Sequence, residues 1–180
     1  MNKINKIPKI LLLFLLLSGS TVVVKAQKAE LYRAVATKSD EGLRAEVAAR
    51  KIFTALQNND QAVLSATFPS KETYQKMILA FGFPTEAEQN QQYSKLNRLY
   101  EQERRRVMRN FTAIQAILKS QSPLTFQKFV FLQKNDVKLT GGRGAAVLTD
   151  KEGKSHSLVF FKFYEFEGAW YVTNKLSWHH

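Results

Sequence analysis

The spacing of hydrophobic residues divides the chain into two parts. From residue 41 to about residue 119, apolar residues recur every three or four positions, which is the period of an amphipathic helix. This pattern predicts helices over residues 41–57, 70–81 and 85–119, with a short helical turn that Asp60 caps. Residues 27–40 have no clear period, and we interpret them as a mobile lead-in or the first turn of a helix.

The helix expected over residues 85–119 is unusually long. It begins with Thr85-Glu86-Ala87-Glu88, a capping box, and no glycine or proline follows until residue 123. At about 1.5 Å per residue such a helix would extend roughly 50 Å. This length exceeds the width of a domain of this size. The helix should therefore project, bend, or break near Glu103, where a charge interrupts the apolar stripe.

Beyond residue 123 the period changes to the alternation of β-strands. Strands are expected over residues 124–133 and 144–149 and in two segments of 155–178. They are separated by turns or breaks at Asn135-Asp136, Asp150–Gly153 and Glu167-Gly168, and by a break or bulge at Gly141-Gly142. Helices followed by closely spaced strands predict an α+β fold, in which N-terminal helices pack on a curved C-terminal antiparallel sheet of about four strands.

Residues 155–178 contain more aromatic side chains than any other stretch of similar length. Strict alternation would place Leu158, Phe160, Lys162, Tyr164 and Phe166 on one face, and Val159, Phe161, Phe163 and Glu165 on the other. Both faces would then be apolar, so we expect both to be covered. The candidates for lining a ligand pocket are Phe160, Phe161, Phe163, Tyr164 and Trp170.

Two segments carry a resemblance to a known superfamily. AARKIFTALQNNDQAVLSATF, within residues 43–68, and the strands of residues 126–178, with their FYEFEGAWYV, resemble the nuclear transport factor two-like proteins. The resemblance implies a sheet that curves around a pocket closed by the helices, with an opposite face that often pairs in a dimer. The same superfamily includes ketosteroid isomerase-like enzymes.

The first 26 residues have the features of a signal peptide. Lys3, Lys6 and Lys9 precede the apolar run 10–17, and Val24 and Ala26 suit the signal peptidase, so cleavage is expected between Ala26 and Gln27. The remaining residues, 27–180, would form one domain and be exported to the periplasm or the exterior. An uncleaved N-terminal anchor is the alternative, because Thr21–Val24 extends the apolar stretch.

Composition excludes several kinds of chemistry. The chain has no cysteine, which excludes disulfides, thiolate metal sites and thiol catalysis. Its net charge is +12, and removing the four lysines of the leader leaves +8. An exported basic protein is expected to meet anionic surfaces rather than nucleic acid. Its three histidines, His156, His179 and His180, have no further ligands at suitable spacing, so we expect neither a metal nor a cofactor.

A basic cluster on the long helix is the candidate anion-binding site. Lys95, Arg98, Arg105 and Arg109 lie near one flank of that helix, and could bind lipid headgroups, anionic polysaccharide or an acidic partner. A solvated charged face is the simpler interpretation, since Glu101 stands four residues before Arg105, the favourable order for an ion pair.

Candidate catalytic residues are few. Glu165 is the one acid in a strongly apolar strand, with Tyr164 and Tyr171 as hydroxyl donors nearby, although regular alternation points Tyr164 to the opposite face. Glu165 could instead reach solvent or pair with Lys175. We therefore expect a non-catalytic binding module for an apolar or amphipathic ligand or a second copy of itself. The alternatives are an isomerase- or cyclase-like enzyme and a periplasmic lipid carrier.

Overall fold

The computed structural model describes residues 32–35, 39–80, 86–121, 123–134 and 139–180. The helices are α2 (Asp40–Asn58), α3 (Gln61–Ala66), α4 (Lys71–Ala80) and α5 (Glu86–Ser120), and the strands are β1 (Tyr32–Val35), β2 (Thr125–Lys134), β3 (Gly141–Thr149), β4 (Ser155–Phe166), β5 (Ala169–Val172) and β6 (Leu176–His179). Helices precede a curved antiparallel sheet, so the predicted α+β class is confirmed. The predicted leader, the turn at Asn135-Asp136 and the capping threonine Thr85 lie outside the described residues.

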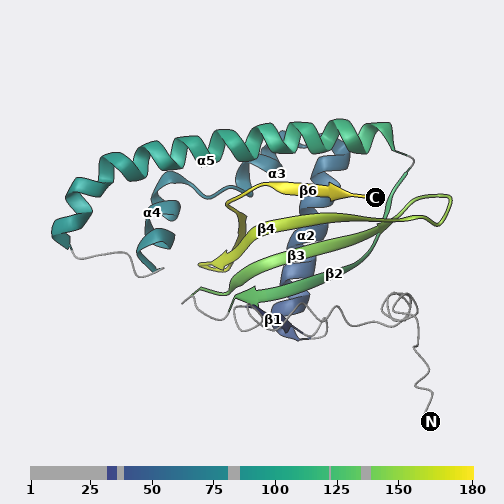
Figure 1. The fold of residues 1–180 in the computed structure, drawn as a ribbon, viewed down its shortest axis with the longest axis horizontal. Coiled ribbons are helices and arrows are strands. Elements are labelled where there is room, and N and C mark those ends of the chain that lie inside the picture. The colour runs from purple at the N-terminus through teal and green to yellow at the C-terminus, as the bar shows by residue number, and fades with distance from the viewer. Residues whose placement is uncertain (1–31, 36–38, 81–85, 122, 135–138) are drawn as a thin grey trace, which may run out of the picture. The chain divides into compact units, whose positions relative to one another are not determined.

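The sheet has six described strands instead of the expected four (Figure 1). Its order is β1-β2-β3-β4-β5, and β6 also pairs with β4. The segment predicted as one final strand is divided, because β5 pairs with the second half of β4 and β6 with its first half. The two-residue turn between β4 and β5 is the predicted Glu167-Gly168, whose φ angles of 49° and 77° belong to the left-handed region.

The first strand corrects our interpretation of residues 27–40. Residues 32–35 form β1, neither a lead-in nor a helical turn, and Tyr32 pairs with Lys134 at the far end of β2. A segment of four residues is too short for its hydrophobic pattern to indicate a strand. The free backbone edge of β2, about 100 residues later, supplies their hydrogen-bonding partners.

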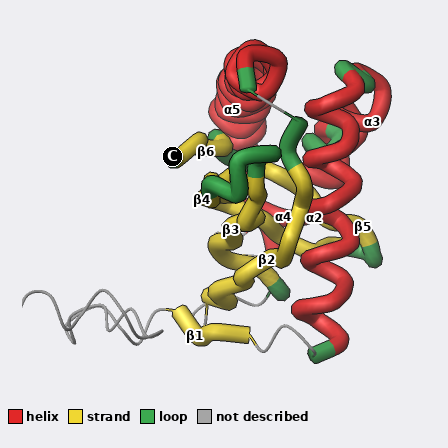
Figure 2. The backbone as a smooth tube through the Cα atoms, turned by 90° about the vertical axis from the view of Figure 1, so that its right-hand side faces the viewer, coloured by secondary structure: helices red, strands yellow, loops and turns green. Residues whose placement is uncertain are grey.

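Helix α2 covers one face of the sheet, and the opposite face has no described helix over it (Figure 2). Ala45 and Ala49 are fully buried, and Phe53 packs on Phe126 of β2 with ring centroids 5.8 Å apart. Leu43 and Val47, which contribute to the apolar period of the predicted helix over residues 41–57, are exposed. In the first half of α2 the small side chains of Ala45 and Ala49 let the helix lie close to the sheet, while Leu43 and Val47 face outward.

Helix α5 is one uninterrupted helix of 35 residues, so the predicted long helix is present. It does not break at Glu103, whose carboxylate instead pairs with Arg106 on the next turn. Its first half lies beside α4 and its second half along β6 (Figure 1). Its buried stripe consists of Tyr100, Val107, Phe111, Ile114 and Leu118. The long helix α5 is therefore accommodated because its two halves pack against different elements, α4 and β6.

Two β-bulges change which side chains share a face. In β2 the register shifts between Phe126 and Lys128, and this extra residue places Phe126 on the same covered face as Phe129. In β4 three steps from Phe160 to Phe163 face two steps on β3. Phe160 and Phe163 consequently point the same way, with ring centroids 5.1 Å apart, and both are fully buried.

The strict alternation that we expected for β4 is therefore wrong beyond Phe161. Phe163 and Glu165 lie on the helix-covered face with Phe160, whereas Tyr164 lies on the open face with Phe161. The cause is the extra residue near Lys162, which a period of two cannot reveal. The open face of β4 therefore carries Phe161, Tyr164 and Phe166, and the covered face carries Phe160 and Phe163.

Gly141 and Gly142 lie within β3, so the predicted break is absent, whereas the predicted alternative of a bulge agrees with the register shift between Gly142 and Gly144. A Cβ atom added at Gly141 would stand 1.8 Å from the Tyr164 ring. One added at Gly144 would stand 2.0 Å from the Phe129 ring. In this strand glycine makes space for aromatic rings from the neighbouring strands, instead of ending it.

Candidate binding surfaces

The space expected to hold a ligand is filled by aromatic rings. Phe129 packs edge-on against Phe160 and Phe163, at centroid distances of 5.5 and 5.8 Å. Phe163 also lies 4.6 Å from Trp170. Because Phe160 and Phe163 are completely buried in the core cluster, these two candidates stabilise the fold and line no open pocket.

Of the five predicted pocket residues, Trp170 lines a hollow. This hollow, of about 280 Å³, lies between α2, α3 and the β4–β5 turn, and its other lining residues include Ile52, Val63 and Gly168. The indole Nε1 of Trp170 is buried and has no hydrogen-bond partner among the described residues. The remaining two candidates, Phe161 and Tyr164, lie on the open face of the sheet.

The predicted catalytic residues do not form a site. Glu165 accepts two hydrogen bonds from the Arg44 guanidinium of α2, at 3.0 and 3.2 Å, instead of pairing with Lys175. The hydrogen bond and charge of Glu165 raise the pKa of Arg44. Tyr164 and Tyr171 pair with each other across β4 and β5, on the face opposite Glu165. A carboxylate already held by a guanidinium lacks the apolar cavity that acid–base catalysis would require.

The cations predicted to bind anions are all exposed on α5. Lys95, Arg98, Arg105 and Arg109, together with Gln102, follow steps of three and four residues, so they form one stripe on the side away from the core. The ion pair expected between Glu101 and Arg105 is replaced by a bond from the Arg105 guanidinium to the backbone carbonyl of Glu101, at 3.2 Å.

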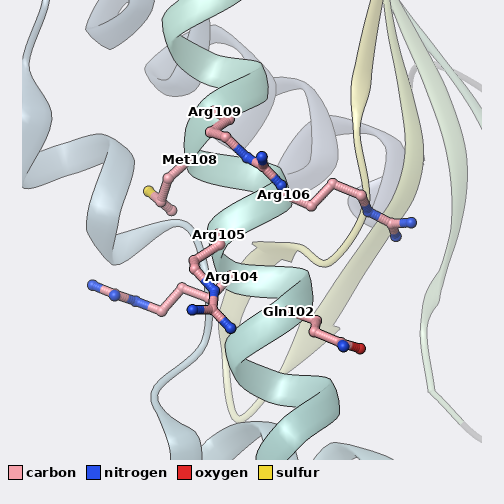
Figure 3. Close-up of a pocket in the computed structure, with 6 residues that line it drawn as sticks. All are labelled: Gln102, Arg104, Arg105, Arg106, Met108 and Arg109. Atoms are coloured by element: carbon pink, nitrogen blue, oxygen red, sulfur yellow. The ribbon is translucent and has the colours of Figure 1, made fainter.

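A surface hollow of about 770 Å³ lies between side chains of this part of α5, and Figure 3 shows the residues that line it. It is lined by Gln102, Arg104, Arg105, Arg106, Met108 and Arg109. Arg106 extends to one side, where it bonds Glu103 and the side-chain oxygen of Asn174, while Arg104 and Met108 extend to the other side (Figure 3). The arginines therefore diverge, which suits a broad anionic surface better than one small anion.

The open face of the sheet combines apolar and basic side chains. One row across the strands is Val130, Ala145 and Val159, paired in register. Val130 and Leu132 are 40% and 38% exposed. The guanidinium of Arg143 and the ammonium of Lys175 both approach the Phe161 ring, 5.5 and 5.2 Å from its centroid.

His156 is buried beside the hairpin turn and is only 2% exposed. Its Nε2 lies 2.9 Å from Oδ2 of Asp150, and its ring stacks on Trp178 at 5.3 Å. The hydrogen bond with His156 is the largest cause that lowers the pKa of Asp150. We did not predict this pair from the sequence. Asp150 and His156 lie six residues apart on either side of a predicted hairpin turn, and this spacing could have indicated a contact across the turn.

Within the described residues, no group of three or more potential metal-ligating side chains occurs. Nor does any described helix combine the length and apolar character that crossing a membrane requires. No family model, curated protein or solved structure matches the chain. The resemblance to the nuclear transport factor two-like proteins therefore remains a prediction.

Proposed function

We propose that this protein is an exported, non-catalytic module that binds anionic lipid surfaces through the open face of its sheet. The carrying observation is the exposure of Val130 and Leu132 on a sheet face that no described helix covers. Apolar side chains in that setting gain free energy when another surface removes them from water.

Charge identifies the kind of surface. Lys128, Arg143 and Lys175 border the apolar row, and none of the described residues in the paired rows of β2, β3, β4 and β6 on this face is acidic. Two copies packed by this face would bring these cations together, which disfavours a dimer. An anionic lipid headgroup complements them, at about 1 kcal/mol for each lysine or arginine near the surface.

The close packing of the rings of Phe129, Phe160 and Phe163 leaves no space for a ligand between them, which supports binding to a surface. Phe160 and Phe163 are packed against other rings, so the apolar contact must come from the outer face. Export, which the leader predicts, would bring this face to the outer side of a membrane. The arginine stripe of α5 would add long-range attraction to the same negatively charged surface.

The first prediction concerns vesicle binding by the full mature chain. It should co-sediment with vesicles containing phosphatidylglycerol and bind phosphatidylcholine vesicles much more weakly. The double variant Val130→Ser, Leu132→Ser should weaken binding at least about fivefold, because it removes the apolar contact. Lys128→Gln should weaken it about fivefold through one lost charge.

Leu43→Ser is the control, since Leu43 is an exposed leucine on the side of α2 that faces away from the sheet. It should bind as the unmodified protein does. Equal losses in the control and the double variant would contradict the proposal. So would a dimer that dissociates in the double variant, because the face would then serve a second copy.

A further inference from the structure

A third hollow, a groove of about 380 Å³, lies where α3, α4, α5 and β5 meet. Its lining residues are Ser65, Ala66, Phe68, Pro69, Ser70, Thr73, Tyr100, Arg104 and Tyr171. The volume is within the range of about 300–1,000 Å³ that small-molecule sites have.

The walls of this groove are fixed by contacts among the four elements. The rings of Phe68, Tyr74 and Tyr100 lie within 5.5–6.0 Å of one another, and hold α4 against α5. The backbone N–H of Val172 donates to the carbonyl of Thr67 at 2.8 Å, which ties β5 to the end of α3. The groove is therefore formed by the fold itself.

Three groups in the groove retain hydrogen-bond donors. The side chains of Arg104 and Tyr171 make no hydrogen bond or ion pair within the described part of the chain. Ser70 Oγ donates to Thr73 Oγ1 at 2.9 Å, so the hydroxyl hydrogen of Thr73 is left to donate elsewhere. One guanidinium and two hydroxyls from three elements thus line a single hollow.

We infer that this groove binds a small oxyanion carried on an aromatic or similarly flat apolar group. A guanidinium forms paired hydrogen bonds with phosphate, sulfate or carboxylate oxygens. The hydroxyls of Tyr171 and Thr73 supply the remaining donors, and the rings of Phe68 and Tyr100 supply an apolar wall for the ligand body. The residues differ from those of the lipid-binding face, so this inference does not rest on the proposed function.

Calorimetric titration of the mature chain with phenyl phosphate tests the inference. We expect saturable binding at one site, with inorganic phosphate and phenol each binding at least about tenfold more weakly. Arg104→Gln should weaken phenyl phosphate at least about tenfold, since a hydrogen bond to a charged group is lost. Tyr171→Phe should weaken it less.

Arg105→Gln is the control, because Arg105 is the exposed neighbour on α5 and does not line the groove. It should change binding less than about twofold. Equal losses for Arg104→Gln and Arg105→Gln would show general attraction to a basic helix and would overturn the inference, as would the absence of saturable binding. Val130→Ser, Leu132→Ser should bind phenyl phosphate normally, which separates failure here from failure of the lipid proposal.

Discussion

At the scale of single residues, buried polar groups fix the positions of neighbouring elements. Asp150 accepts hydrogen bonds from the backbone N–H groups of Glu152 and Lys154, at 3.0 and 2.8 Å, and its second oxygen contacts His156. One carboxylate thus holds the β3–β4 turn and the imidazole beneath Trp178. Sequence predicted the turn, from Asp150 and Gly153, but not the second role of the aspartate.

The lowered pKa of Asp150 predicts how stability depends on pH. A depressed pKa in the folded state contributes stability that is fully present above the unfolded value of about 3.9, and is lost as pH falls through the folded value. Asp150→Asn, which keeps an oxygen for the turn, should therefore lose less stability than the unmodified protein as pH falls below about 3.9.

Urea unfolding at several pH values measures this difference. Glu152→Gln removes a carboxylate from the same turn without touching His156, and should keep the acid sensitivity of the unmodified protein. Parallel pH profiles for Asp150→Asn and the unmodified protein would show that the contact with His156 does not contribute.

At the scale of elements, α5 is joined to the sheet edge by one side chain. The amide of Asn110 donates to the carbonyl of Leu176 at 3.1 Å, and its oxygen accepts from the N–H of the same residue. Asn110-Phe111-Thr112 has the pattern of a glycosylation sequon, yet in the fold this asparagine takes the place of a neighbouring strand for β6. A polar residue beside the buried stripe of a helix was the only available signal.

Replacing Asn110 with alanine should destabilise the fold by about 1–3 kcal/mol, because two backbone groups of Leu176 lose their partner in a buried setting. Chemical denaturation monitored by tryptophan fluorescence measures the change. Thr112→Ala is the control: it also removes the sequon, but Thr112 is exposed and bonds within its own helix. Equal effects of both variants would contradict the bridging role.

Elements were more predictable than faces. The helices starting after Asp60 and Ser70 could be located because each cap forms a local hydrogen bond, to the N–H of Val63 and of Thr73. The faces of β4 could not, since a bulge depends on the pairing of two strands and leaves no mark on one sequence. The basic stripe of α5 could be predicted from its helical period. The groove at Arg104 could not, because its residues are distant from one another in the sequence.

At the scale of the whole molecule, the described fold is stabilised without disulfides. The chain contains no cysteine, and one aromatic and aliphatic cluster extends from α2 through the sheet to α5. A secreted protein that lacks disulfides must rely on such a core. This is compatible with export, for which the leader remains the argument.

Expression of the full chain in a bacterium tests the leader. The protein recovered from the periplasm or the medium should have the mass of a chain that begins at Gln27, because the apolar run and Ala26 suit cleavage there. Intact-mass spectrometry of soluble and membrane fractions decides the matter. Recovery from membranes with residues 1–26 still attached would instead support the anchor.

The bulge in β4 changes which residue numbers, odd or even, lie on the covered face of the sheet. The residues that pair with β6, from Ser157 to Phe160, have their even positions on the covered face, whereas those that pair with β5, from Phe163 to Phe166, have their odd positions there. Two phases thus coexist in one strand of 12 residues. Each side chain of β4 must be assigned to a face from its nearer partner strand, since counting along the strand gives the wrong answer across Lys162.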